Sequence, residues 1–248
     1  MVFLANVGTT NINRFAPAVP RDFRGVESAA ETWPFRWRFR QADMRIIPFS
    51  RTLLLLAAWM PFNVFADYQA GLDAFSIGDY EAALAQWAPL ADQGDAKAQF
   101  GMGQLCANGW GTAPDDAAAL KWYELAAAQG HGEASYSIGV MYQNGWGVEQ
   151  SDTEALKRMQ AAAETGFAAA HRAMGDMYEG GIGVAPDNVQ AYAWFETGAK
   201  LGDSQANFDR EELAMNMNEA EIAAAEVLAE QWLADFRAQH PGVEFPDN

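Results

Sequence analysis

The chain has 248 residues, of which 50% are hydrophobic, and it carries 16 Lys and Arg against 33 Asp and Glu, a formal net charge of −17 at pH 7. Residues 67–248 are more acidic still, with 8 Lys and Arg against 29 Asp and Glu, so this part repels DNA, RNA and anionic membrane surfaces, and we expect no nucleic-acid partner. A single cysteine, Cys106, excludes an intramolecular disulfide.

Residues 1–43 differ from everything that follows. They contain six arginines, no lysine and scattered prolines, without a periodic apolar face. Because a second candidate start, Met44, precedes an export signal, we interpret residues 1–43 as a non-native extension that results from a start codon assigned too early. The alternative is a disordered arm.

Residues 44–66 have the layout of a cleavable secretory signal. Two arginines precede a short apolar run at residues 52–60, and Val64 and Ala66 occupy the −3 and −1 positions of a cleavage site. The run is short for a membrane span. The sequence therefore predicts a periplasmic or secreted protein with no stable membrane insertion after cleavage; an uncleaved signal would instead tether the chain.

Residues 67–94 form the first predicted helix pair. Apolar residues at helical spacing occur on both sides of a turn near Gly78, with Phe75 before it and Trp87 after it. This unit resembles a plain tetratricopeptide unit, and we expect it to cap the N-terminal end of an array.

Three 36-residue units follow without insertion, at residues 95–130, 131–166 and 167–202. The doublet Met102-Gly103 returns as Ile138-Gly139 and Met174-Gly175. Each unit has two amphipathic helical segments, and Cys106 falls on the apolar stripe of the first of these helices, where we expect it to be buried. A fixed period of this length predicts stacked helix pairs, none of which buries its apolar face alone.

Turn and cap residues separate these helices. Asp115, Ser151 and Asp187 share one position and are predicted to be the N-caps of the three second helices. The preceding loop repeats as Gly109-Trp110-Gly111, Gly145-Trp146-Gly147 and Gly181-Ile182-Gly183, and its glycines are expected to be left-handed.

The repeated pattern resembles that of the Sel1-like repeat family, which is related to tetratricopeptide repeats. Repeat two departs from it at Arg158-Met159, where Trp-Tyr is usual. The resemblance implies an all-α solenoid of antiparallel helix pairs in a right-handed superhelix, with the first helices on the concave side. It also implies scaffolding and protein binding; exported members include regulators that bind the outward domains of sensor kinases.

Residues 203–240 are predicted to be C-terminal capping helices, followed by a tail at 241–248. The segment 204–215 begins like another first helix, with Ala206, Phe208 and Leu213 on its apolar face. A longer amphipathic helix follows, for which Asn218 and Glu221 have the spacing of a capping box.

No catalytic or metal-binding motif emerges. No serine is followed by lysine at +3, and Lys-Thr-Gly, Gly-x-Ser-x-Gly, His-Glu-x-x-His and Cys-x-x-Cys are all missing. We therefore expect no enzyme activity, no cofactor and no metal. The alternative hypothesis is a cell-wall protein that binds or hydrolyses peptidoglycan or β-lactams.

What remains is the surface of the first helices, where a protein or peptide partner is expected to bind. The candidate positions that the core does not use are Phe100, Gln104, Tyr136, Val140, Gln143, Arg172, Asp176 and Glu179. An aromatic side chain in a polar groove can anchor a peptide; alternatively, Phe100 and Tyr136 pack against the neighbouring repeat. Trp110 and Trp146 in the loops have the same two interpretations, partner contact or structural packing.

Overall fold

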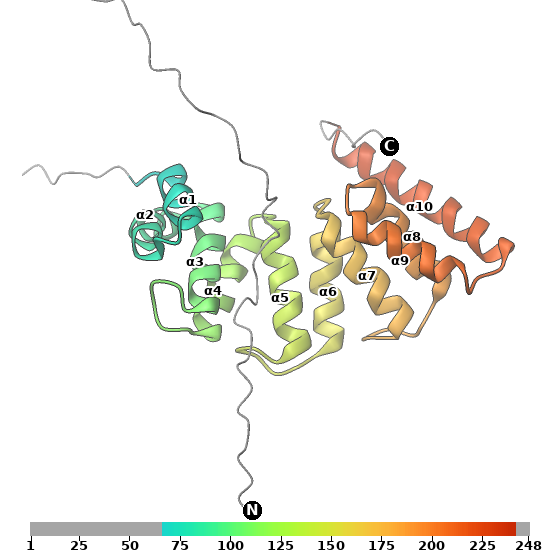
Figure 1. Cartoon of the computed structure of the whole chain (residues 1–248), viewed down its shortest axis with the longest axis horizontal. Coiled ribbons are helices and arrows are strands. Elements are labelled where there is room, and N and C mark those ends of the chain that lie inside the picture. The colour runs from blue at the N-terminus through green and yellow to red at the C-terminus, as the bar shows by residue number, and fades with distance from the viewer. Residues whose placement is uncertain (1–65, 242–248) are drawn as a thin grey trace, which may run out of the picture. The chain divides into compact units, whose positions relative to one another are not determined.

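The structure is a computed structural model of the chain, and it describes residues 66–241 (Figure 1). This range is all-helical, as predicted, with ten α-helices and no strand. The helices are α1 Tyr68–Ser76, α2 Tyr80–Asp92, α3 Ala96–Asn108, α4 Asp116–Ala127, α5 Gly132–Asn144, α6 Asp152–Ala163, α7 Ala168–Gly180, α8 Asn188–Lys200, α9 Ser204–Ala214 and α10 Glu219–Gln239. The predicted extension (1–43), signal (44–66, except Ala66) and tail (241–248, except Pro241) lie outside the described residues.

Side-chain caps determine where most of the helices begin. The predicted caps Asp115, Ser151 and Asp187 each accept a backbone N–H from the first turn of α4, α6 and α8. Asn218 and Glu221 form the capping box expected for α10. These bonds satisfy N–H groups that have no partner inside the helix, so they fix the boundaries that the sequence predicts.

The helices pack in chain order, each pair against the next, as Figure 1 shows from α1 to α8. Small side chains recur at the closest contacts. The alanines at two repeated positions are fully buried: Ala98, Ala134, Ala170 and Ala206 in the first helices, and Ala83, Ala119, Ala155 and Ala191 in the second. Burial of these positions between neighbouring helices makes each repeat dependent on the next.

Glycine permits the closest approach within each pair. A Cβ atom on Gly103 would lie 2.4 Å from the ring of Tyr123, which is fully buried. Loop glycines are left-handed as predicted, with φ of 68° at Gly109 and 69° at Gly111. A Cβ on Gly111 would lie 2.8 Å from the backbone of Tyr80, so each loop rests on the preceding repeat.

Two residues depart from the expected burial. Cys106 is only partly buried, because the neighbours Leu105 and Ala107 take the core-facing directions of α3. Phe208 was expected on the apolar face of its helix with Ala206 and Leu213, but it is 59% exposed. The reason is that α10 packs against α8 and does not cover this side of α9.

Candidate functional site

The predicted contact residues lie on three successive first helices. Phe100 and Gln104 belong to α3, Tyr136, Val140 and Gln143 to α5, and Arg172, Asp176 and Glu179 to α7. We call the surface formed by these eight residues the first-helix face. Its members repeat at a spacing of 36 residues, and the fifth residue of each helix is Phe100, Tyr136 or Arg172.

The fifth residues of these helices make the contacts between repeats. Phe100 stacks on His131, with ring centroids 4.6 Å apart, and Tyr136 meets Phe167 edge-on at 5.4 Å. His131 and Phe167 are the N-cap residues of α5 and α7. Both aromatic residues are therefore partly buried between repeats, while the rest of each ring remains accessible from the face.

The two aromatic N-caps give up the usual capping bond. Neither His131 nor Phe167 makes a side-chain hydrogen bond to its own helix, whereas Asp95 and Asp203 do so for α3 and α9. A lost cap costs about 1 kcal/mol, and an aromatic pair contributes about 0.5–1.5 kcal/mol, so the two effects are comparable. Packing between repeats has replaced local helix capping at these two positions.

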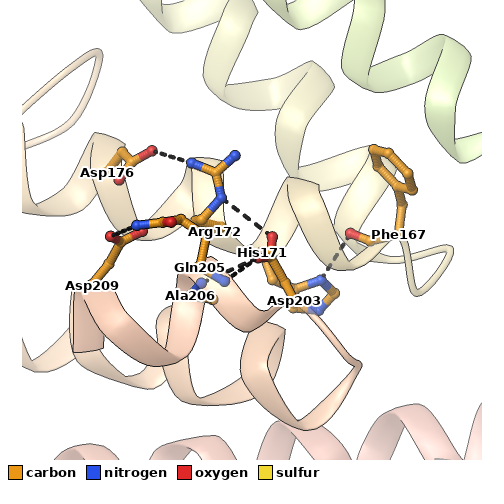
Figure 2. A network of polar contacts seen from close by, with 8 residues as sticks. All are labelled: Phe167, His171, Arg172, Asp176, Asp203, Gln205, Ala206 and Asp209. Carbon is orange, nitrogen blue, oxygen red and sulfur yellow. Dashed lines mark hydrogen bonds and ion pairs between the residues drawn. The ribbon is translucent and has the colours of Figure 1, made fainter. Parts of the chain in front are cut away.

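Arg172 makes the corresponding contact with the next repeat through an ion pair. Its guanidinium Nε donates to Asp203, the N-cap of α9, at 3.2 Å, and its Nη1 lies 3.6 Å from Asp176 on α7 (Figure 2). Burial lowers the pKa of Arg172, but Asp203 and Asp176 outweigh it, so the pKa is raised. The cation is held between the two carboxylates.

Asp176 is the most perturbed carboxylate of the face. Burial raises its pKa to about 6; Arg172 opposes this shift, and the negative charges of Asp209, Glu179 and Asp203 add to it. Half of its side chain is exposed. This end of the face is thus an acidic cluster around a single arginine, and a bound cationic group would favour the ionised form of Asp176.

The remaining face residues are only partly engaged. Gln104 and Val140 accept side-chain hydrogen bonds from Asn108 and Asn144 through their backbone carbonyls, at 2.9 and 2.8 Å. Gln143 likewise accepts from Gln150 at 2.9 Å. Their own side chains are half-buried, and Glu179 is exposed. These groups form the polar surface between the aromatic contacts.

The loop tryptophans lie apart from these residues. Trp110 stacks on Tyr80, with centroids 4.9 Å apart and planes at 8°, and contacts the edge of Phe75 at 5.5 Å. It thereby joins the core around α1 and α2. Trp146 is partly buried, and its backbone N–H donates to the carbonyl of Met141 at 3.0 Å.

Sequence reasoning missed two residues of the same stripe. Phe208 on α9 and Met215, the C-cap residue of α9, occupy the positions that Arg172 and Glu179 occupy on α7, and they are 59% and 83% exposed. The 36-residue spacing was the signal that could have found them. They extend the first-helix face by one helix.

A cavity of about 390 Å³ lies between α8 and α9, but its charged groups are already paired, Arg210 and Lys200 with Glu196, and Asp203 with Arg172. Within residues 66–241 no cluster of His, Cys, Asp or Glu could hold a metal ion, and no helix is long and apolar enough to cross a membrane.

An array of helix pairs with a repeated core and an irregular face defines an α-solenoid of the repeat class. The Sel1 repeat profile matches residues 96–131, 132–167 and 168–203, each one residue later than the predicted unit. The chain belongs to the Sel1 repeat family. Sel1 repeats are generally protein–protein interaction modules.

Solved structures show the same likeness. One is a protective antigen present in uropathogenic Escherichia coli strains displaying an SLR fold, with 27% identity and a TM-score of 0.58 over 68% of this chain; this chain covers 37% of that protein. Another is a Sel1 repeat protein from Oxalobacter formigenes, with 36% identity and a TM-score of 0.48 over 52% of this chain and 97% of that one. No curated protein matches significantly.

Proposed function

We propose that this chain is an exported protein-binding module, without catalysis of its own, that holds a protein or peptide partner across the first-helix face. One observation carries the proposal: the alanine positions of the core are uniform while the face is not. Alanine is fully buried at the same position of α3, α5, α7 and α9, at residues 98, 134, 170 and 206. The face position four residues beyond the inter-repeat contact is Gln104, Val140 and Asp176 in successive repeats, and none of these is fully buried.

This difference is what a recognition surface requires. The recurring buried alanines keep the helices at fixed spacing, and the differing side chains of the face then present a defined series of apolar, polar and acidic groups to a partner. Phe100 and Tyr136, which remain partly exposed, supply apolar contact, and the acidic cluster around Arg172 supplies charge. The resemblance further predicts that this face is concave.

The site of action that we propose follows from the signal layout of residues 44–66. Export would place the module in the periplasm of a Gram-negative cell or outside the cell, where an envelope or signalling protein is the partner. Periodic helices without a catalytic motif favour a regulator or scaffold over an enzyme.

The test places a photo-cross-linking amino acid at Gln104, Gln143 or Glu179 of the full chain in bacterial cells. We expect a discrete cross-linked product from these positions. Gln160 and Glu164, which are exposed outside the face, are the matched controls and should give none. Equal products from controls and face positions would rule out the face. Turnover of a chromogenic β-lactam or of muropeptides by the purified protein would contradict the absence of catalysis.

A further inference from the structure

The contacts between repeats follow one rule. The fifth residue of α3, α5 and α7 touches the N-cap residue of the next first helix: Phe100 touches His131, Tyr136 touches Phe167, and Arg172 touches Asp203. Aromatic residues meet rings, and the arginine meets a carboxylate. The chemistry of each position therefore matches that of the helix start seated on it.

The rule fails at the last position, Phe208 of α9. The residue that would cap a fourth partner helix is Gln239, 36 residues after Asp203, but it is the last residue of α10. Because α10 packs against α8, no helix start reaches Phe208 within the described residues. Its ring is 59% exposed, and Met215, seven residues further along the chain at the C-cap of α9, is 83% exposed. These two side chains lie on one side of α9, about 10 Å apart along its axis.

The negative charge around Phe208 and Met215 favours a basic partner. Glu212 lies between Phe208 and Met215 on the same side of α9, and Asp209, which follows Phe208 in the chain, belongs with Glu179 to the acidic cluster around Arg172. None of these three carboxylates has a cation within ion-pair distance in residues 66–241. The nearby cations are already paired, Arg172 with Asp176 and Asp203, and Arg210 with Glu196 and Glu211.

We propose that Phe208 and Met215 receive the first two turns of a helix from a basic partner protein, with an aromatic side chain at its N-cap. This proposal rests on the proposed function and names the kind of partner. The seated helix would continue the stack as the next first helix, its aromatic cap on Phe208. Its positive N-terminal end and flanking Lys or Arg residues would lie against Glu212 and Asp209. A second copy is disfavoured because residues 67–248 carry a net charge of −21.

The probe is a peptide with the sequence of residues 167–180, acetylated and labelled at its C-terminus, in which Asp176→Lys and Glu179→Lys make it basic. Phe167 starts this peptide, and in the intact chain it is the N-cap residue that Tyr136 contacts. Fluorescence anisotropy measures its binding to the full chain. We expect at least tenfold weaker binding to Phe208→Ala, and weaker binding to Met215→Ala. Leu125→Ala, which removes an equally apolar side chain that is 49% exposed on α4, should bind as the wild type does.

Two peptide controls complete the test. Replacing Phe167 of the probe by Ala should weaken binding about tenfold, and the unmodified acidic sequence should bind more weakly than the basic one. Unchanged affinity for Phe208→Ala, or no binding by the basic probe, overturns the proposal and leaves the proposed function standing, because cross-links at Gln104 and Gln143 do not depend on α9. Loss of those cross-links together with Phe208-dependent peptide binding would contradict the proposed function instead.

Discussion

Trp232 of α10 packs against Trp194 of α8, with ring centroids 4.3 Å apart and planes at 37°. Together with the buried residues Ala225, Ala229 and Leu233, this contact closes the C-terminal end of the array. Trp232→Ala should lower the free energy of unfolding by about 2 kcal/mol, because it removes a large, partly buried ring and its aromatic partner contact. Urea unfolding followed by circular dichroism measures the loss.

The matched control is Gln231→Ala, which changes an exposed neighbour on the same helix and should alter stability by less than about 0.5 kcal/mol. Hydrogen exchange should also show α10 losing protection before α3–α8 in Trp232→Ala. Equal losses in the two variants would mean that the tryptophan pair does not hold α10 in place.

Glycine contacts within the helix pairs give a graded prediction. A Cβ on Gly175 would lie 2.4 Å from the ring of Phe195, which is fully buried and has no room to move. On Gly139 it would meet the end of the flexible Met159 side chain at 2.9 Å. Gly175→Ala should therefore destabilise the protein by about 2 kcal/mol.

Gly139→Ala should change stability by less than about 1 kcal/mol, because Met159 can shift and alanine favours the helix. Thermal unfolding of both variants checks the order. A larger loss in Gly139→Ala than in Gly175→Ala would show that the packing within each pair is not set by the side chain opposite the glycine.

The helix boundaries and the fold follow from local sequence. Asp115, Ser151 and Asp187 identify the starts of three helices because a capping side chain acts within its own first turn. The left-handed loop glycines and buried alanines are likewise visible in the repeat itself.

The contacts between repeats are a different matter. Phe100 reaches His131 only because of the angle at which one pair stacks on the next, which no local pattern encodes. The exposure of Phe208 depends on α10 turning back to α8. The Gly-x-Gly loop that follows the first helix of each repeat is missing after α9, which indicates that the repeat pattern ends there. Its absence does not predict which helix α10 packs against.

Trp110 tests the two interpretations of the loop tryptophans. Because it stacks on Tyr80 and touches Phe75, Trp110→Ala should lower the free energy of unfolding by about 2 kcal/mol. Cross-linking from Gln104 should be unchanged under conditions where the variant is folded. Unchanged stability with lost cross-linking would instead favour a direct partner contact by Trp110.

His171 makes the fold sensitive to acid. The ring is buried in α7, Nδ1 donates to the carbonyl of Phe167 at 3.2 Å (Figure 2), and burial lowers the pKa to about 4. The unfolded chain, with an ordinary histidine pKa of 6.5, binds more protons between pH 6.5 and 4. The contribution of neutral His171 to the free energy of unfolding is therefore complete above pH 6.5. It falls by about 3 kcal/mol as the pH falls towards 4.

His171→Asn tests this assignment, because the amide can still donate to Phe167 but does not titrate. Urea unfolding at pH 7.5 and 4.5 should show a smaller loss at the lower pH in the variant than in the wild type. The same dependence of the free energy of unfolding on pH in the variant and the wild type would contradict the role of His171.

Asp176, five residues further along the same helix, has the opposite effect on how the free energy of unfolding depends on pH. Its pKa is raised to about 6 in the folded protein from an ordinary 3.8, so the folded state binds the extra proton and stability falls as the pH rises through 6. Asp176→Asn should be the more stable protein at pH 7.5, by about 0.5 kcal/mol after allowance for its half-exposed side chain, and the difference should vanish near pH 4. Asp73→Asn, at an exposed position on α1, should show no such gain. A titration of the Asp176 carboxyl by NMR measures the pKa directly, and a midpoint near 4 would contradict the burial of this carboxylate beside Asp209 and Glu179.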